Sequence, residues 1–357
     1  MQSPDHPPRS ICILRLSALG DVTHVVPVIN ALKEHWPCTQ ITWIIGAAEH
    51  HLLNTLPGVE FIVFDKHGGW REIRKLHHAL KQRQFDILLH MQVAARANLV
   101  SRLIHASLRL GWDRLRSRDF HNWFTNATVA AVPFQHQVEG FLEFPRALGL
   151  NVSEPRWDIP IGLEAQNWAR GQIDPSRPTL VISPCSSHVA RNWRPEYYSM
   201  VADFAAARLD MQVILSGGPG KLDRTVGAAI ESNMRESCLN LIGQDTLEQS
   251  KALLKQADLL ISPDSGPAHI ASALGTDVLG LYAATWSRRS GPYNSLNLCV
   301  DRFAEAARRY RKREPEQLRW GSRIETPGVM DLIRPNEVME RLASWRDVFE
   351  SRPDSGE

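Results

Sequence analysis

Short apolar runs alternate with longer, polar-patterned segments along most of the chain. The apolar runs cover residues 11–16, 41–46, 61–65, 85–91, 179–184, 211–218, 238–243, 258–263 and 277–283. Strands that are buried on both faces of a sheet have this continuous apolar character. Because the segments between them have the length of helices, the pattern predicts βαβ units, mostly parallel sheets and an α/β fold class.

The alternation stops between residues 150 and 178, where prolines recur and no buried strand is predicted. A chain of 357 residues is also long for one hydrophobic core. We therefore expect two α/β domains of similar size with a cleft between them, over residues 1–165 and 166–334. A helix and a polar tail are expected over residues 335–357.

Composition narrows the class of protein. The chain is 43% hydrophobic and 22% charged, as in globular proteins, and its net charge of +2 gives no strong field for nucleic acid. The five cysteines form no C-x-x-C pair, so we expect them to be reduced and mostly buried. The opening "MQSPDHPPRS" lacks the apolar core of a secretory signal, and no apolar run reaches the length of a membrane span. A cytoplasmic protein is expected.

The segment "LSALGD", residues 16–21, follows the first predicted strand. Ligands of open α/β sheets bind outside the carboxyl ends of strands, so the place suits a site. Gly20 is its single glycine, so the G-x-G-x-x-G pattern of dinucleotide binding is missing. Asp21 either belongs to a site or caps the following helix.

The segment "PCSSHVARNWRPEYY", residues 184–198, follows the first strand of the second domain. Ser186, Ser187 and Arg191 offer two hydroxyls and a permanent cation near a predicted helix start. This combination suits a phosphate group. An ordinary serine-rich turn with a solvated arginine is the alternative.

A third polar segment, "ISPDSGPAHIASALG" at residues 261–275, joins an apolar run to a predicted helix. Pro267 suits the first helical turn, so Asp264, Ser265 and Gly266 come just before the helix. Backbone N–H groups there can hold a phosphate, while Asp264 and His269 can reach a sugar. The alternative is a capped helix with a buried histidine.

Metal and nucleophile motifs are missing from the sequence. There is no H-E-x-x-H, G-x-S-x-G or D-x-D triplet. The turn "LSGGPGKLDR", residues 215–224, fails as a Walker A loop because Leu222 stands where a hydroxyl must hold magnesium. We expect no bound metal and no cofactor.

Three stretches resemble the heptosyltransferases of glycosyltransferase family 9. They are "ILRLSALGDVTHVVPVINALKEHWP", "ARNWRPEYY" and "LLISPDSGPAHIASALGTDVLGLYAATWSRRSGPY", and the resemblance extends over residues 11–330. It implies a GT-B fold, in which two Rossmann-like, doubly wound domains face each other across a cleft. It also implies inverting, metal-independent transfer of L-glycero-D-manno-heptose from ADP-heptose to the inner core of lipopolysaccharide.

The resemblance also implies roles for the residues named above. Asp21 matches the general base of the amino-terminal, acceptor-binding domain. Arg191 stands where the family usually has a Lys that pairs with the donor phosphates, and Asp264 matches the acid facing the transferred sugar. The adjoining donor contacts are matched by Ser186, Ser187, Ser265, Gly266 and His269.

Two departures from the family pattern and three alternatives remain. Arg191 replaces Lys, and Lys221 lies close to where the family often places an acid near the ribose, with Asp223 two residues on. The alternatives are a GT-B transferase with another nucleotide sugar, an inactive sugar-nucleotide sensor and a nucleotide-dependent oxidoreductase. The single-glycine turn argues against the last of these.

The acceptor implied by the resemblance is a lipid-linked core oligosaccharide. The basic segments 70–83 and 308–313 are either solvated surfaces or contacts with anionic headgroups. We expect a monomer that can contact the cytoplasmic face of the inner membrane.

Overall fold

The computed structural model of the chain describes residues 6–351. It divides into two compact units, and unit 1 ends at Pro160 while unit 2 begins at Ile161. The predicted boundary after residue 165 falls inside helix α7 (Leu163–Arg170) of unit 2. The predicted polar tail beyond residue 351, and the first five residues of the predicted non-secretory amino terminus, lie outside the described range.

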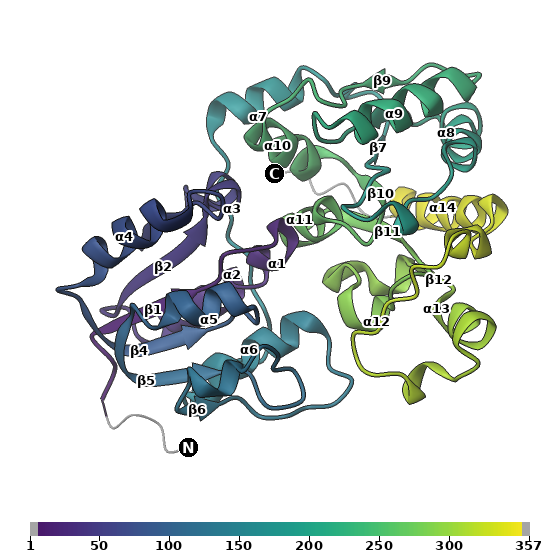
Figure 1. Cartoon of the computed structure of the whole chain (residues 1–357). Helices are drawn as coiled ribbons and strands as arrows, with labels where there is room; N and C mark the ends of the chain where they lie inside the picture. The colour runs from purple at the N-terminus through teal and green to yellow at the C-terminus, as the bar shows by residue number, and fades with distance from the viewer. Residues whose placement is uncertain (1–5, 352–357) are drawn as a thin grey trace. The chain divides into compact units, whose positions relative to one another are not determined.

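Unit 1 is built on a parallel six-stranded sheet with the strand order β3-β2-β1-β4-β5-β6 (Figure 1). Its strands are β1 (Ser10–Leu14), β2 (Gln40–Gly46), β3 (Val59–Phe64), β4 (Gln84–His90), β5 (His105–Gly111) and β6 (Ala127–Thr128). Its helices are α1 (Leu19–Thr23), α2 (Val26–His35), α3 (Ala47–Leu53), α4 (Gly69–Leu80), α5 (Ala95–Ser101) and α6 (Gln137–Ala147), with the short 3-10 helix η1 (His121–Trp123).

The reversal of strand order in unit 1 places helices on both faces of the sheet. The chain runs from β1 outward to β3, then crosses to β4 and runs outward the other way. Because such crossovers are right-handed, α4 and α5 share one face. Leu76 of α4 and Val100 of α5 accordingly belong to one apolar cluster with Cys12 and Leu14 of β1.

Unit 2 repeats this plan with the strand order β12-β11-β10-β7-β8-β9, again parallel. Its strands are β7 (Thr179–Ile182), β8 (Gln212–Leu215), β9 (Leu239–Asn240), β10 (Leu259–Pro263), β11 (Asp277–Tyr282) and β12 (Val300–Asp301). Its further helices are α8 (Pro195–Leu209), α9 (Lys221–Asn233), α10 (Leu247–Gln256), α11 (Gly266–Leu274), α12 (Ser287–Ser290), α13 (Phe303–Ala306) and α14 (Pro335–Glu350).

The carboxyl-terminal helix α14 is part of the hydrophobic core of unit 2. Its Val338, Leu342 and Trp345 are buried in the same cluster as the strand residues Ile182 and Ile261. The Trp345 indole N–H donates to Asp277 at 2.8 Å, at the start of β11. The structure has the helix α14 where one was expected after residue 334, and this helix belongs to the compact unit of the strands before it.

Each strand predicted from an apolar run is found, but three strands were missed. β5 has the half-exposed, alternating sequence "HASLRLG", because β6 pairs only with its last residues, Leu110 and Gly111. β6 and β12 have two residues each, too few for a recognisable pattern. The sheets thus extend beyond the apolar runs at their edges.

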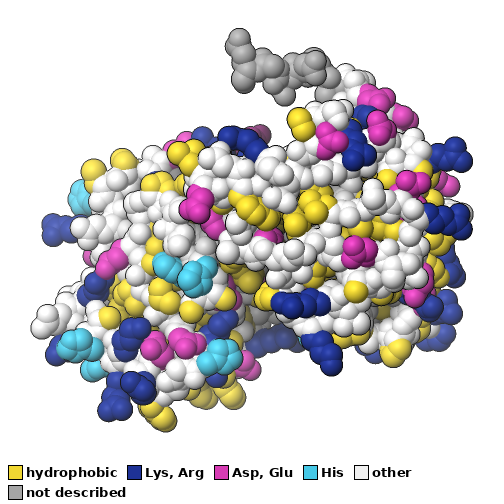
Figure 2. All heavy atoms as spheres, turned by 90° about the horizontal axis from the view of Figure 1, so that it is seen from above, with side chains coloured by type: hydrophobic (Ala, Val, Ile, Leu, Met, Phe, Trp, Pro, Cys, Tyr) yellow, Lys and Arg dark blue, Asp and Glu magenta, His cyan; other side chains and the backbone are white. Residues whose placement is uncertain are grey.

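The state of the cysteines and the mixture of surface charges agree with the composition of a globular protein. All five cysteines are free, and Cys38 is exposed rather than buried. Figure 2 shows Lys and Arg side chains interspersed with Asp and Glu side chains on the face drawn. Across residues 6–351, no helix combines the length and the apolar character that a membrane span requires.

Candidate active site

The predicted site residues lie where strand order reverses in each sheet. The reversals fall between β1 and β4 in unit 1 and between β7 and β10 in unit 2. Asp21 follows β1, Arg191 follows β7 and Asp264 follows β10 directly. Ligands of doubly wound sheets bind at this point, outside the carboxyl ends of the strands. The topology therefore places all three residues at the expected ligand edge of their own sheet.

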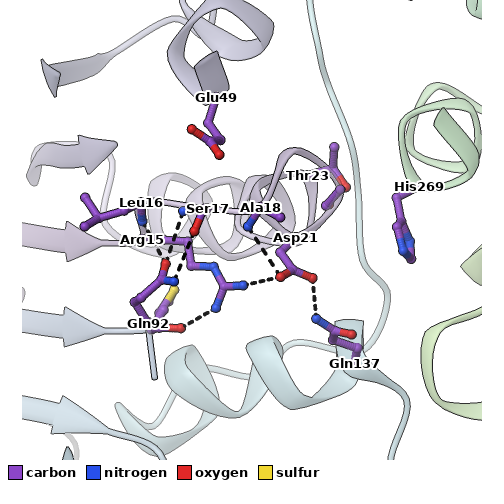
Figure 3. A network of polar contacts seen from close by, with 12 residues as sticks. Arg15, Leu16, Ser17, Ala18, Asp21, Thr23, Glu49, Gln92, Gln137 and His269 are labelled. Carbon is purple, nitrogen blue, oxygen red and sulfur yellow. Dashed lines mark hydrogen bonds and ion pairs between the residues drawn. The ribbon is translucent and has the colours of Figure 1, made fainter. Parts of the chain in front are cut away.

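Asp21 is the third residue of helix α1, and Arg15, Gln137 and the backbone of Ala18 are among the partners that hold its carboxylate (Figure 3). Arg15 forms an ion pair with Oδ2, and the Gln137 side-chain amide donates to Oδ1 at 2.6 Å. The backbone N–H of Ala18 is 3.5 Å from Oδ2, which is the contact expected of a helix-capping acid. The Asp21 side chain remains 28% exposed, so it is held firmly and still accessible.

Arg15 and Gln92 fix the loop that carries Asp21. The buried Arg15 donates to the Met91 carbonyl at 2.7 Å and lies over the Phe141 ring, 5.2 Å from its centroid. The Gln92 amide oxygen accepts from the N–H groups of Leu16 and Ser17 at 2.9 and 3.1 Å. These contacts join the end of β1 to the end of β4, across the reversal of strand order.

The sequence interpretation missed Arg15, Gln92 and Gln137. Arg15 interrupts the apolar run "ICILRL", and a charge at the end of a buried strand requires a partner. That signal could have identified Arg15. Gln137 lies 116 positions from Asp21, and nothing in its local sequence sets it apart.

A buried pair of histidines lies at the end of β4. His90 Nε2 and His121 Nδ1 both lie within hydrogen-bond distance of the Asn98 side-chain oxygen, at 3.0 and 3.1 Å. Because His121 Nε2 accepts from the Trp112 backbone N–H at 3.1 Å, the proton of His121 resides on Nδ1. Burial lowers the pKa of His121 to about 4. Burial, followed by the charges of His121 and Arg109, holds the pKa of His90 well below its usual range.

In unit 2 the structure brings Arg191 and Asp264 together and adds Glu325, which the sequence interpretation missed. Arg191 Nη1 lies 3.6 Å from Asp264 Oδ2. Arg191 Nε and Nη2 both donate to Glu325 Oε1, at 2.9 and 2.7 Å. The Arg191 side chain is 8% exposed and that of Asp264 12%, whereas that of Glu325 is 32% exposed. The predicted phosphate-binding cation therefore lies between two carboxylates.

Asp264 is a stabilised anion. Burial alone would raise its pKa, but the hydrogen bond and charge of His269, together with the charge of Arg191, lower the pKa of Asp264 below its usual range. His269 Nε2 lies 3.6 Å from Asp264 Oδ1. In the same way, burial opposes the ionisation of Glu325, but the hydrogen bond and charge of Arg191 lower its pKa. The cluster holds its acids in the ionised form.

A buried tryptophan anchors the segment that carries Arg191. Trp193 is 2% exposed and meets the Tyr198 ring edge to face, with centroids 5.1 Å apart. Its indole N–H donates to the Ile333 carbonyl at 3.1 Å, which joins this segment to the chain just before α14. Arg191 is the last residue of the short helix η2 (Val189–Arg191) and lies two positions before Trp193. The buried tryptophan therefore holds the backbone of Arg191 in place.

The two predicted serine ligands differ in their surroundings. Ser186 is buried, and its hydroxyl donates to the His188 carbonyl at 2.9 Å while accepting from the His188 N–H at 3.2 Å. Ser187 is exposed. The Ser186 hydroxyl therefore stabilises the loop itself, and Ser187 is the more accessible of the two predicted phosphate contacts.

Ser265 and Gly266 form the start of helix α11. Ser265 is the N-cap residue with extended backbone, and its hydroxyl lies 2.7 Å from that of Ser262 instead of capping the helix. Gly266 is the first helical residue and Pro267 follows in the first turn, as predicted. The amino-terminal N–H groups of the helix carry partial positive charge, which suits an anion.

Comparison with known proteins establishes the family of the chain. The model of the family described as "Glycosyltransferase family 9 (heptosyltransferase)" matches residues 73–318. The lipopolysaccharide core heptosyltransferase OpsX of Haemophilus influenzae is 36% identical over 335 residues, which are 94% of this chain and 96% of that protein. The chain belongs to glycosyltransferase family 9.

Solved structures of heptosyltransferases show the same fold. The Escherichia coli ADP-heptose lipopolysaccharide heptosyltransferase II matches with a TM-score of 0.71 and 20% identity, over 96% of this chain and 100% of that one. E. coli heptosyltransferase WaaC with ADP matches with a TM-score of 0.72 and 16% identity, over 94% and 99%. The predicted GT-B fold class, built from two doubly wound parallel sheets, is confirmed.

Proposed function

We propose that this family 9 chain transfers L-glycero-D-manno-heptose from ADP-heptose to the inner core of lipopolysaccharide, with inversion and without a metal ion. The observation that carries the proposal is the cluster of Arg191 and Asp264 beside the start of α11 in unit 2. A buried guanidinium and a helix N-terminus suit a diphosphate, and an ionised acid suits sugar hydroxyls. The similarity to OpsX over nearly the whole chain supports the choice of sugar and acceptor.

In the proposed reaction an acceptor hydroxyl attacks the anomeric carbon of the donor heptose, on the face opposite the diphosphate. Asp21 takes the hydroxyl proton, the new carbon–oxygen bond forms, and the bond to the diphosphate breaks to release ADP. Arg191 and the N-terminus of α11 stabilise the negative charge that develops on the leaving diphosphate. Asp264 holds the heptose, with Ser187, Ser265, Gly266 and His269 as further donor contacts.

Asp21 suits the role of base because its geometry is fixed before the acceptor binds. Arg15 and Gln137 hold the carboxylate from two sides, so little conformational entropy remains to be lost in the reaction. The hydroxyl becomes more acidic as it bonds to carbon, so a weak base is sufficient late in the step. Unit 1 is accordingly proposed as the acceptor domain and unit 2 as the donor domain.

Thermal-shift comparison of ADP-, UDP- and GDP-linked sugars tests the donor assignment. The proposal expects ADP-heptose to raise the melting temperature most, and a larger rise with a UDP- or GDP-sugar would contradict it. The same result would favour the alternative, a GT-B transferase for another nucleotide sugar. Mass analysis of the core oligosaccharide in a deletion strain would show which core position lacks its heptose.

We further propose that the chain is a monomer that contacts the cytoplasmic face of the inner membrane through the basic segment of residues 308–313. This segment overlaps the π-helix η4 (Ala307–Arg311). Arg308 is paired with Glu314 at 2.9 Å. The exposed cations are Arg308, Arg309, Arg311, Lys312 and Arg313. A lipid-linked acceptor would be reached at such a surface.

Vesicle sedimentation tests this contact. Each Lys or Arg near an anionic surface contributes about 1 kcal/mol, so Arg309→Gln/Arg311→Gln should weaken binding to phosphatidylglycerol vesicles by about 30-fold. Arg71→Gln/Arg74→Gln in α4 serves as the matched control in the other basic segment. The assignment would be contradicted if the wild-type protein bound neutral phosphatidylcholine vesicles as well as phosphatidylglycerol vesicles. It would also be contradicted if the control variant lost more binding than Arg309→Gln/Arg311→Gln. Sedimentation velocity without lipid should give a single species of monomer mass.

A further inference from the structure

The cation proposed to receive the donor diphosphate already carries an anion. Both Nε and Nη2 of Arg191 donate to one oxygen of Glu325, at 2.9 and 2.7 Å. This is the donor pair that Arg would offer to a phosphate oxygen. With Asp264 Oδ2 at 3.6 Å from Nη1, the guanidinium has a carboxylate on two sides. A diphosphate can use the Nε and Nη2 donors only if Glu325 gives them up.

The charges of this cluster also oppose a second anion. Arg191 contributes one positive charge, and Asp264 and Glu325 contribute one negative charge each. His269 lies 3.6 Å from Asp264, and the charge of Arg323 also acts on Glu325. His188 Nδ1 lies 4.0 Å from Glu325 Oε1, and its imidazole is half-exposed. A donor diphosphate therefore approaches two carboxylates beside the guanidinium while Glu325 remains in place.

Glu325 is also the acid that can move. Asp264 follows the buried strand β10 directly and is 12% exposed, so its side chain has little room. Glu325 lies in an irregular segment between the short helices η5 (Pro315–Gln317) and η6 (Val329–Leu332), and its side chain is 32% exposed. The backbone beside it is fixed, because the Ile324 N–H donates to the Ala284 carbonyl at 2.8 Å. The carboxylate can therefore rotate into solvent without unfolding its segment.

We propose that Glu325 is an internal competitor for the donor diphosphate: its carboxylate occupies the Arg191 guanidinium in the empty site, leaves when the diphosphate binds, and returns when ADP departs. This inference rests on the proposed function, in which Arg191 binds the diphosphate. The competing carboxylate keeps the buried cation paired between turnovers. It also weakens the hold of the site on ADP, so that product release is faster.

Competition and positioning make opposite predictions for the same variant. If Glu325 merely orients Arg191, removing its charge lets the guanidinium drift and weakens ADP binding. If Glu325 competes, removing its charge frees the guanidinium and strengthens ADP binding. The direction of the change in ADP affinity therefore separates the two roles.

Calorimetric titration of ADP into Glu325→Gln provides the test. Glutamine has the shape of glutamate without its charge, and we expect ADP to bind about tenfold more tightly, or about 1.4 kcal/mol. ADP should also become a stronger product inhibitor. Glu316→Gln, which removes an exposed acid from the neighbouring helix η5, should leave ADP affinity unchanged and so controls for net charge. Unchanged or weaker ADP binding by Glu325→Gln would overturn the proposal.

Two further variants keep the test decisive. If Glu325→Gln unfolds at too low a temperature for titration, Glu325→Ala is used instead. The rise in melting temperature that ADP causes in Glu325→Ala is compared with the rise in the wild type, and a smaller rise in the variant would overturn the proposal. Arg191→Ala tests the function on which the inference rests. If Arg191→Ala binds ADP as tightly as the wild type, the proposed diphosphate site itself is wrong, whatever Glu325 does.

Discussion

Replacing Asp21 with Asn separates its chemical role from its structural role. The change removes the charge but keeps one oxygen, which can accept either from Gln137, as Oδ1 of Asp21 does, or from the helix N-terminus, as Oδ2 does. As a general base, Asp21 should contribute about 10²–10⁴-fold to turnover, and Asn cannot take a proton. ADP affinity should not change, because the proposed donor contacts all lie in unit 2.

The expected cost in stability follows from the contacts of Asp21. Its ion pair with Arg15 is lost, while Arg15 keeps the Met91 carbonyl and its place over Phe141. Losing a hydrogen bond between charged groups costs about 1.5–3 kcal/mol. For a unit of this size the melting temperature should fall by about 3–12 °C, so the variant remains folded at assay temperature.

The assay combines heptosyl transfer, ADP titration and thermal melting on one preparation. Glu34→Gln is the matched control, because it removes an acid of unit 1 whose partner Arg156 is exposed. Exposed ion pairs contribute little to stability, so this control should retain activity, and its free energy of unfolding should lie within about 0.5 kcal/mol of the wild-type value. Near wild-type turnover by Asp21→Asn, in a preparation whose ADP binding is intact, would refute the assignment of the base.

Three further changes test other parts of the account. Asp264→Asn should lower heptosyl transfer by about tenfold or more, while ADP still binds. The loss of stability should be small, because Arg191 keeps its ion pair with Glu325. Loss of ADP binding together with a lower melting temperature would assign Asp264 a structural role. Transfer should survive EDTA, since Arg191 and the start of α11 stabilise the leaving group; activity that returns only when Mg²⁺ or Mn²⁺ is added back would contradict this. Stability should fall in mild acid, because the folded pKa of His121 is lowered to about 4. The unfolded state takes up this proton at a higher pH than the folded state does. The contribution of His121 to the free energy of unfolding is therefore fully present above about pH 6.5, and the free energy of unfolding decreases by about 3 kcal/mol as the pH falls toward 4. Urea denaturation across this pH range should show the decrease in the free energy of unfolding, and His121→Asn should make the decrease smaller. A free energy of unfolding that does not change with pH would exclude a buried neutral His121.

The sequence predicted the fold well where burial is two-sided. Apolar runs in β1, β2, β4, β7, β10 and β11 are continuous because helices cover both faces of these strands. The edge strands β6 and β12 were missed because two residues carry no period, and β5 because its outer half is exposed. The boundary of unit 2 lies before α7, whose eight polar-patterned residues resemble the proline-rich connection they follow.

The candidate site was predictable where strand ends meet and not elsewhere. Arg191 and Asp264 follow neighbouring strands, so the order of the parallel sheet brings them together. Glu325 reaches Arg191 from 134 positions away, on a segment without regular structure. Gln137 reaches Asp21 from another helix in the same way. Such partners depend on the tertiary fold, and a local pattern cannot reveal them.

The central claim is heptosyl transfer from ADP-heptose, and its most direct test is analysis of the reaction product. Purified protein is incubated with ADP-heptose and a core acceptor that lacks heptose, and the product is examined by mass spectrometry and NMR. The account predicts one added heptose for each ADP released, with the anomeric configuration opposite to that of the donor. Transfer from a different nucleotide sugar alone, or a product that retains the donor configuration, would contradict it.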